Sequence, residues 1–483
     1  MPFDGLQDYA AALEKRGELL TIGAPVNPEL EITEIADRFV RSAGPALRFT
    51  APRGSQYPVL INLFGTLDRT AFALGAADLG EIAARLEQLL RTQPPGSLRD
   101  KLRALPRLIE MAAWAPRTTS KAPCQEVVEE SPSLADLPVL KCWPGDGGRF
   151  LTLPIVVTRD PETGLRNLGM YRMQVHDERT TGMHWHPHKV GAEHYRRYEA
   201  LGRRMPVSVA LGSDPAVIYA ATAPLPEGFD EVLFAGFLRR RPVELVRCRT
   251  NDLEVPADAE FVLEGFVDPG ERMTEGPFGD HTGYYSPPGE FPVFHLTALT
   301  RRARPVYPCT IVGRPPKEDC FLGKATERIF LPLLRMQLPE VLDINLPVEG
   351  IFHNLALVRM AKRYPGHAFK VMHGLWGLGQ MMLTKIIVVV DEEVDVQDLS
   401  EVIWRVGNNI DPERDICFVP GPVDILDHAA RLTGFGTKMG VDATRKLPGE
   451  GFGRSWPDPI EMAPEVKARV DALLADLALE GVQ

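Results

Sequence analysis

The chain has 483 residues, of which 44% are hydrophobic and 25% charged, and this length predicts roughly two to four domains. Its formal net charge of -11 argues against non-specific nucleic-acid binding, which depends on neutralising phosphates. The longest apolar runs are too short to span a bilayer, and the first residues lack a signal-peptide pattern. The six scattered cysteines have neither zinc-site spacing nor disulfide-scaffold density, so we expect reduced thiols in the cytoplasm.

Residues 1–115 are expected to form a mixed α/β lobe without recognisable chemistry. Apolar residues recur there at helical spacing, and one short apolar run indicates a buried strand. The expected helices are 8–19, 32–40 and 79–90, and the expected strand is 58–64.

Residues 116–305 are expected to form the central domain. Periodicity fades over 117–138, where Pro, Ser, Thr and acidic residues accumulate, which indicates a linker. β-type segments then dominate, with short helices at 192–201 and 230–238. This mixture predicts an antiparallel sheet or a partly open barrel that carries helices. The expected strands are 151–158, 168–176, 181–186, 207–211, 260–267 and 291–300.

Residues 306–450 are expected to form a C-terminal α/β domain, because strands alternate with helices there. Residues 434–456, rich in Gly and basic side chains, are expected to form a loop. The tail, 451–483, contains an amphipathic helix at 465–479 that fits a contact between copies of the chain. The expected strands are 355–360 and 385–390, and the expected helices are 327–337, 367–372 and 397–406.

The stretch from Glu275 to Tyr285 is the first candidate for chemistry. It places two carboxylates, Glu275 and Asp280, five residues apart in a loop rich in Gly and Pro. Acids in such a loop can simply be turn residues. A proton relay, by contrast, needs a carboxylate pair near an arginine, which holds one acid ionised while the second acid keeps a proton for delivery.

Arg172, at the end of the segment Asn167–Arg172, supplies the arginine that such a pair needs. On a regular strand Asn167 and Arg172 would point to opposite faces, although a bend at Gly169 would change that. An arginine on a strand is more often a surface ion-pair partner. The segment alone therefore leaves both roles open.

Three histidines, His184, His186 and His188, occupy alternate positions around Trp185. On a strand they would share one face, which suits a metal site or an anion pocket. Pro187 complicates a strand, because it cannot donate to the ladder. An exposed polar edge with one buried Trp explains the pattern equally well.

Glu231 is the last candidate, at the expected start of a helix. The helix dipole favours an acid in the first turn, so its position needs no functional explanation. The glycines of 374–379 lack the spacing of a dinucleotide-binding loop, and the sequence contains no Walker or GxSxG motif.

Eight segments carry a family pattern in matching order and spacing: 30–37, 122–124, 167–172, 206–212, 250–256, 275–285, 364–368 and 438–444. In these segments the sequence resembles the UbiD family of reversible decarboxylases, and it looks closest to the polyprenyl-hydroxybenzoate decarboxylase branch. The resemblance implies a multidomain protein of the α+β / α/β class. Its central domain would be split-barrel-like and bind prenylated FMN, followed by a C-terminal α/β domain and a terminal helix.

The resemblance also implies roles for single residues. The catalytic trio falls on Arg172, Glu275 and Asp280, with Asp280 as the proton donor. The metal ligands fall on three further residues: Asn167, His188 and Glu231. Two oxygens and one imidazole suit Mn²⁺ or a similar divalent cation better than zinc, and the family pattern leaves room for K⁺ as well.

The flavin site implied by the resemblance draws on several segments. Its members are Met170, Tyr171, Arg172, His184, Trp185, His186, Lys189, Val190 and Lys385. The branch pattern has Arg before the Trp and an aliphatic residue after it, where this chain has His184 and His186. How the cofactor phosphate or the substrate is contacted there is therefore open.

The implied activity is the non-oxidative, reversible decarboxylation of an aromatic acid. The first hypothesis for the substrate is a polyprenyl-hydroxybenzoate or a related naphthoate of ubiquinone or menaquinone biosynthesis. The second is a small aromatic or heteroaromatic acid, which a small closed cavity would favour over a long apolar channel. A catalytically silent flavin-binding protein of the same fold is the third, although it has no evident need for the charged trio.

The partners implied by the resemblance are few. A prenyltransferase must supply the prenylated flavin, and the chain is expected to form a homo-oligomer, either a dimer or a hexamer. A prenylated substrate would also permit peripheral association with a membrane.

Overall fold

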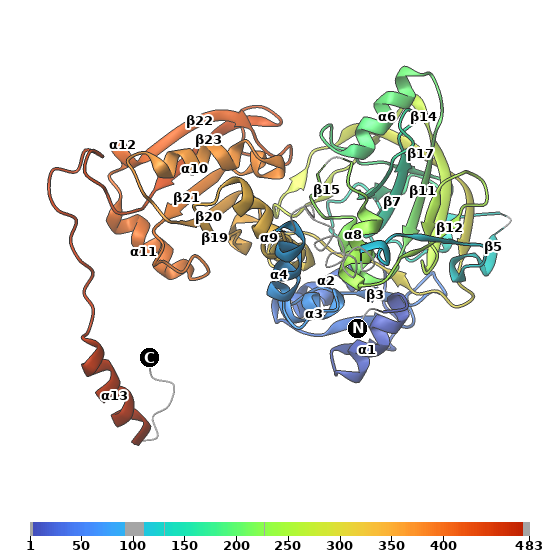
Figure 1. Cartoon of the computed structure of the whole chain (residues 1–483). Coiled ribbons are helices and arrows are strands. Elements are labelled where there is room, and N and C mark those ends of the chain that lie inside the picture. The colour runs from blue at the N-terminus through green and yellow to red at the C-terminus, as the bar shows by residue number, and fades with distance from the viewer. Residues whose placement is uncertain (1–2, 92–110, 130, 227, 477–483) are drawn as a thin grey trace, which may run out of the picture.

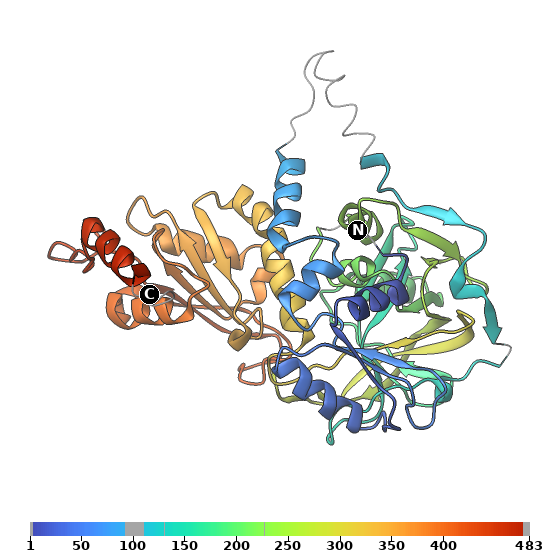
Figure 2. The same ribbon diagram turned by 90° about the horizontal axis from the view of Figure 1, so that it is seen from below.

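The computed structural model describes residues 3–91, 111–129, 131–226 and 228–476. An N-terminal lobe packs against the central domain, and a C-terminal α/β domain lies beside them, reached through the long helix α9 (Glu318–Gln337) (Figure 1). The terminal helix α13 (Pro464–Asp476) stands apart at the end of an extended connection (Figure 1), and Figure 2 shows the N-terminal, central and C-terminal parts from below. None of the helices in these ranges is both long and apolar enough to cross a membrane.

In its described residues, the N-terminal lobe combines four helices with a small sheet of order β1-β2-β3-β18. The predicted helix 79–90 is confirmed as α4, which Asp78 caps by accepting from the Glu81 N–H. The predicted helix 8–19 is too long, because the chain turns at Arg16 and enters a strand at Leu19. The elements are α1 (Leu6–Lys15), β1 (Leu19–Ile22), α2 (Glu31–Arg41), β2 (Ala46–Phe49), β3 (Val59–Ile61), α3 (Leu67–Ala73), α4 (Leu79–Leu90) and β18 (Tyr307–Pro308).

The central domain is built on an open antiparallel sheet of order β10-β17-β14-β11-β7-β8, with β5 paired to β17. Within the described residues the two ends of this order do not pair, so the sheet is not a closed barrel. Its strands are β5 (Val127–Glu129), β7 (Pro154–Arg159), β8 (Arg166–Met170), β10 (Thr180–Gly182), β11 (Met205–Leu211), β14 (Phe261–Glu275) and β17 (Gly289–Arg301). Together with the flanking domains, it confirms the predicted multidomain mixed α/β class.

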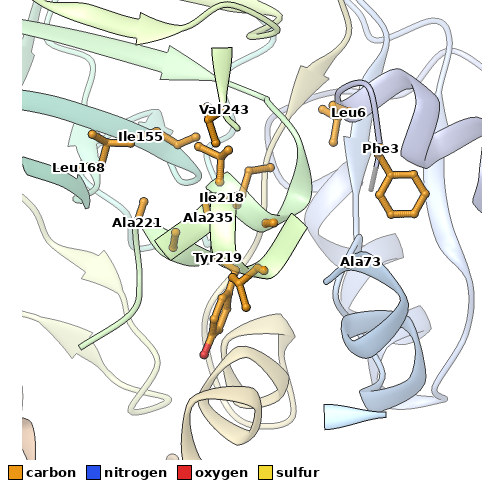
Figure 3. Close-up of a cluster of buried hydrophobic side chains, with 14 of the residues drawn as sticks. Phe3, Leu6, Ala73, Ile155, Leu168, Ile218, Tyr219, Ala221, Ala235 and Val243 are labelled. Carbon is orange, nitrogen blue, oxygen red and sulfur yellow. The ribbon is translucent and has the colours of Figure 1, made fainter. Parts of the chain in front are cut away.

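Both faces of this sheet are buried. Successive side chains along a strand point in opposite directions, so each strand contributes residues to two cores. On β7, Ile155 and Val157 join one core and Val156 the other. Figure 3 shows the first core, where Ile218 and Tyr219 of α7 lie between the sheet and α9. The Tyr219 hydroxyl meets the Thr326 hydroxyl of α9 at 3.1 Å. The helices of this domain are α6 (Val190–Ala200), α7 (Pro215–Ala220) and α8 (Glu231–Arg239).

The predicted linker 117–138 is largely structured. Its Arg117–Thr119 segment pairs with β12, and Val127–Glu129 pairs with β17. Local sequence gave no periodicity there, because these short strands are held by partners far along the chain. The remaining small elements are β4 (Arg117–Thr119), η1 (Pro123–Gln125), η2 (Leu134–Asp136), β6 (Phe150–Leu151), β9 (Met173–Gln174), β12 (Glu244–Arg247), β13 (Glu254–Pro256), β15 (Phe278–Gly279) and β16 (Tyr285–Ser286).

The C-terminal domain has a five-stranded sheet of order β19-β20-β21-β23-β22, with helices on both faces. The apolar run of β21 suits a central parallel strand, since Ile387 and Val389 face α10 while Val388 and Val390 face the core that includes Val402 of α11. The elements are β19 (Val341–Asn345), η3 (Val348–Gly350), β20 (Leu355–Met360), α10 (His367–Trp376), η4 (Gly379–Leu383), β21 (Ile386–Val390), α11 (Leu399–Asn409), α12 (Pro412–Asp415), β22 (Ile416–Pro422) and β23 (Phe435–Asp442).

The predicted loop 434–456 is wrong over its first part, which forms β23 between β21 and β22. In this strand, Gly440 is required by close packing and not by a turn. A Cβ atom on Gly440 would lie 2.5 Å from the Met372 sulfur and 2.9 Å from the Cys417 sulfur.

Helix α9 connects all three parts of the molecule. Its first residue, Glu318, is buried and accepts from the N–H groups of Asn62 and Phe64 and from the Thr310 hydroxyl. Along its length it packs against α3, α4 and β19. The helix that leads from the central domain to the C-terminal domain is therefore anchored at its first residue.

Candidate active site

The loop after Glu275 is fixed by short strands at both ends. Glu275 is the last residue of β14, Gly276 turns the chain with a φ of 98°, and Phe278–Gly279 pairs with Tyr285–Ser286. A side chain at Gly279 would collide with Trp143, whose Cδ1 lies 2.2 Å from the Cβ position. The two acids of this stretch therefore sit on a supported frame and not in a free turn.

Arg172 lies where the strand geometry breaks. β8 ends at Met170 and β9 begins at Met173, so the regular alternation that would separate Asn167 from Arg172 does not extend to Arg172. The carbonyl of Arg172 accepts from the His184 N–H at 3.3 Å. This contact brings the histidine segment alongside the arginine.

The guanidinium of Arg172 joins the two acids of the loop. Its Nε donates to Glu275 Oε1 at 3.0 Å, its Nη1 is bound to Asp280 Oδ2, and its Nη2 donates to Ser286 Oγ at 3.2 Å. The face of the guanidinium lies 4.4 Å from the centroid of the Phe278 ring. The structure thus brings Arg172 together with Glu275 and Asp280, which follow it by more than a hundred residues in the sequence.

This charged cluster is almost fully removed from solvent. The side-chain exposures are 11% for Arg172, 0% for Glu275 and 7% for Asp280. Buried charges are expensive unless each is paired and hydrogen-bonded, and their removal one at a time is strongly destabilising. Such an arrangement is more than packing requires, which is typical of a functional site.

Asp280 is held ionised in this geometry. Burial alone would raise the pKa of its carboxyl, but the hydrogen bond and charge of His281, together with the charge of Arg172, outweigh burial and hold the pKa well below its usual range. The sequence led us to expect a less polar setting for the acid that delivers the proton. In the structure, Asp280 must first gain a proton before it can donate one.

The expected strand 181–186 is wrong beyond Gly182, where β10 ends, and the chain from Met183 to His188 is irregular. The three histidines therefore lie outside a strand, and strand alternation does not set their directions. His184 is buried and its Nδ1 lies 2.7 Å from Glu275 Oε1, while its Nε2 lies 2.8 Å from His186 Nε2. His188 is exposed, with its ring 5.8 Å from that of His186.

Two of the three expected metal ligands lie together. Asn167 is buried on β8, and Glu231 opens α8 with its Oε2 accepting from the Leu168 N–H at 3.0 Å. Burial raises the pKa of Glu231 to about 7, which a nearby cation would reverse. His188 lies on the loop before α6, and no recorded contact within the described ranges joins it to the other two. The oxygen donors present fit a hard divalent cation.

The residues expected at the flavin gather near the start of α6. The Nε1 of Trp185 is buried without a hydrogen-bond partner among the described residues, and Trp185 and Tyr171 pack edge to face with ring centroids 6.4 Å apart. Val190 opens α6 after Lys189, so free backbone N–H groups suit a phosphate there. Met170, the end of β8, adjoins this group. The unpaired donor and the helix start fit an anionic flavin.

Lys385 is placed differently from the other expected flavin residues. It belongs to the C-terminal domain, where its Nζ lies 2.9 Å from Asp427 Oδ2. Asp427 in turn lines a pocket of about 460 Å³ that opens beside Asp280. Residues between Ile425 and Thr433 form the C-terminal side of this pocket, and Tyr284 and Tyr285 form part of the opposite side.

Sequence reasoning missed three polar residues at this site. His281 Nδ1 lies 2.8 Å from Asp280 Oδ1, and His281 Nε2 lies 2.9 Å from His353 Nε2. Asp424 Oδ2 lies 3.8 Å from His353 Nε2. The adjacency of His281 to Asp280 was a usable indication, whereas His353 and Asp424 belong to another domain and carry no motif of their own.

Comparison with known proteins gives the site its context. Three sequence models of 3-octaprenyl-4-hydroxybenzoate carboxy-lyase match the chain: the N-terminal domain at residues 10–88, the Rift-related domain at 117–315 and the C-terminal domain at 320–443. An uncharacterized protein of Archaeoglobus fulgidus is 52% identical over 475 residues, which is 98% of each chain.

Two solved enzymes share the fold over nearly the whole chain. The UbiD-class enzyme HmfF from Pelotomaculum thermopropionicum, in complex with FMN, is 30% identical with a TM-score of 0.80, covering 96% of this chain and 98% of that one. An evolved dimeric form of HmfF has been solved with prenylated FMN.

The second enzyme is vanillic acid decarboxylase from Sedimentibacter hydroxybenzoicus. Its closed form is 28% identical with a TM-score of 0.85, covering 98% of this chain and 99% of that one. Its open form gives a TM-score of 0.80 at 27% identity, covering 98% and 100%. With the family models matching most of its length and the charged trio assembled, this chain belongs to the UbiD family of decarboxylases.

Proposed function

We propose that this protein catalyses the reversible, non-oxidative decarboxylation of an aromatic acid with prenylated FMN and a divalent cation. The observation that carries the proposal is the buried Arg172, bound at once to Glu275 and Asp280 beside an open pocket. A guanidinium with two carboxylates can orient an acid and move a proton, and a silent binding protein has no use for both.

Each member of the trio then has a separate role. Arg172 orients the acidic substrate, Glu275 fixes the guanidinium, and Asp280, which lines the pocket, hands a proton to the carbon that loses carbon dioxide. Prenylated FMN, when bound, supplies the electron sink for the bond cleavage. Asn167, His188 and Glu231 would hold Mn²⁺ or a similar cation.

The decisive experiment is reconstitution. Protein produced together with a flavin prenyltransferase should release carbon dioxide from one member of a panel of aromatic acids, and the flavin-free protein should release none. A loaded protein that binds prenylated FMN but releases no carbon dioxide from any acid in the panel would favour the silent flavin-binding alternative.

The pocket bears on the choice of substrate. Its volume of about 460 Å³ suits one or two aromatic rings. A polyprenyl chain would have to continue outside it, past the exposed side chains of Tyr284 and Leu432. Among the substrates expected from the resemblance, the pocket therefore favours an unprenylated naphthoate or a small hydroxybenzoate over a polyprenyl-hydroxybenzoate.

A paired competition assay separates these substrates. If the enzyme acts on a ring acid without a chain, a short-chain prenylated analogue should have a KM no lower than that of the bare acid. A KM at least tenfold lower for the prenylated analogue would restore the polyprenyl substrate and, with it, association with a membrane surface.

We further propose that the enzyme works in the cytoplasm as a homo-oligomer. All six cysteines are unpaired thiols, which fits a reducing compartment. The helix α13 projects from the body (Figure 1) and exposes Val470 and Leu473, an arrangement that suits a contact with a second copy. Light scattering of the full chain and of a chain ending at residue 450 should show a smaller assembly for the shorter chain.

A further inference from the structure

A line of polar groups continues from Asp280 into the other domain. His281 contacts Asp280 through Nδ1 at 2.8 Å and His353 through Nε2 at 2.9 Å. His353 follows η3, and its Nε2 lies 3.8 Å from Asp424, which follows β22. Two histidines thus connect the acid of the central domain with a carboxylate of the C-terminal domain.

The two histidines differ in how readily they are protonated. Burial opposes a charge on His281, but its hydrogen bond to Asp280 and the nearby carboxylates prevail and raise its pKa to about 8. Burial and the charge of His281 lower the pKa of His353. At neutral pH the pair therefore holds one extra proton, on His281, which donates from both ring nitrogens to Asp280 and to neutral His353.

Charged groups from every neighbouring element contribute to this balance. His281 faces Asp280 on its own loop, Asp319 at the start of α9 and Asp424 from the C-terminal domain. His353 faces Asp424 and the ammonium of Lys189, which precedes α6. The acids favour the proton on His281, and Lys189 opposes one on His353.

Asp280 needs such a neighbour in order to act as a general acid. It is ionised at rest, so each turnover that places its proton on a product carbon requires a new proton at the carboxylate. His281 is positioned to deliver it from Nδ1 to Oδ1. The neutral imidazole keeps its Nε2 proton in the contact with His353, and water from the pocket that Asp280 lines refills the vacated Nδ1, so that one proton enters for each one lost to product.

We propose that His281 reprotonates Asp280 and that His353, reaching across the domain interface, positions His281 and stabilises its charge by accepting from Nε2. Proton supply would then depend on contact between the two domains. The chain resembles the closed form of the Sedimentibacter decarboxylase more than the open form, with TM-scores of 0.85 and 0.80, which fits a relay completed on closure. This inference rests on the proposed decarboxylase function.

The test uses His353→Leu in the flavin-loaded enzyme, because leucine cannot accept from His281 Nε2. His353→Gln is the matched variant, since its amide oxygen can still accept, and His373→Leu is a control on α10 of the same domain, where Nδ1 lies 2.7 Å from the Phe369 carbonyl of its own helix. We expect kcat to fall at least tenfold in His353→Leu with KM unchanged and its alkaline decline moved to lower pH, while His353→Gln keeps most of the activity. Carbon dioxide release in the first turnover should match wild type.

Non-additivity provides a second readout. Since His353 acts through His281, the double variant His281→Gln/His353→Leu should be no slower than the slower single variant. Additive losses, a kcat of His353→Leu within twofold of wild type, or equal slowing of first-turnover carbon dioxide release would each overturn the proposal.

A third readout is independent of activity and so separates this inference from the proposed function. In the flavin-free full chain, ¹⁵N-histidine NMR should show His281 titrating near pH 8, and His353→Leu, which offers no acceptor, should lower that pKa. An unchanged titration would overturn the contact, even if no acid substrate were found. Loss of one bound divalent cation in His353→Gln would also overturn it, since His281, His353 and Asp424 would then be metal ligands.

Discussion

Each acid bound to Arg172 is backed by a pair of histidines, and the two pairs differ in one respect. Glu275 contacts His184, whose Nε2 lies 2.8 Å from His186, two residues along the same segment. Asp280 contacts His281, whose Nε2 lies 2.9 Å from His353 in another domain. The first pair is complete within the central domain, whereas the second exists only when two domains meet.

The pKa shifts of the two histidines that contact these acids also differ. Burial lowers the pKa of His184, so that imidazole is neutral beside Glu275. The hydrogen bond to Asp280 prevails over burial at His281 and raises its pKa to about 8. In the proposed mechanism, Glu275 therefore holds Arg172 in place, while Asp280 is the acid that gains and loses a proton.

The largest effect is expected from Asp280→Asn. An amide keeps the size of the side chain but cannot transfer a proton, so kcat should fall about a thousandfold, within the range of general acid catalysis. The visible absorbance of bound flavin should match wild type. Loss of flavin along with activity would mean that Asp280 is structural, and its histidine pair would lose its distinct role.

Arg172→Lys should cost about a hundredfold in kcat/KM. The ammonium keeps the charge but cannot contact Glu275, Asp280 and Ser286 from one rigid fork. Steady-state kinetics and thermal unfolding of the same preparation would check this. A variant with near wild-type kcat/KM would show that the charge alone, without the shared geometry, couples the two acids.

Glu231→Gln tests a region outside both histidine pairs. Because the neutral amide removes an anionic oxygen ligand, retention of flavin and of divalent cation after gel filtration should drop at least tenfold. The enzyme molecules that still hold flavin should keep a normal pH profile. Undiminished retention would contradict the assignment of Glu231 as a metal ligand.

The smallest change distinguishes the two pairs by pH. His281 is protonated up to its raised pKa, so the wild-type kcat should decline as pH rises through about 8. His281→Gln should lower the plateau about tenfold and abolish that decline. His184→Gln, the matched variant in the other pair, should retain the alkaline decline at the same pH. A decline that persists in His281→Gln would assign it to another group.

Much of the fold followed from periodicity. The strands at β20 and the helices at α4 and α8 were predicted closely, because their burial patterns are local. The segments 117–138 and 435–442 were missed, since their strands form only by pairing with distant partners. The strand assigned to 181–186 was predicted too long, because the chain leaves the sheet after Gly182 and His184 contacts Glu275 instead.

The site divides in the same way. Arg172, Glu275 and Asp280 were chosen by residue type and family resemblance, and the structure brings them together. The contacts of His184 with Glu275 and His186 could not be predicted from the sequence, because alternate spacing indicates a shared face only on a strand. His353 and Asp424 were invisible for a further reason: nothing local marks a residue that meets its partner across a domain interface.

The central claim is that Asp280 delivers the proton to the carbon that loses carbon dioxide. The most direct measurement is hydrogen exchange at that carbon of the decarboxylated product, followed by NMR in D₂O with flavin-loaded enzyme. Wild type should exchange the ring hydrogen for deuterium, and Asp280→Asn, with its flavin retained, should exchange it at least a hundredfold more slowly. Exchange by Asp280→Asn at the wild-type rate would contradict the assignment and point to a different acid.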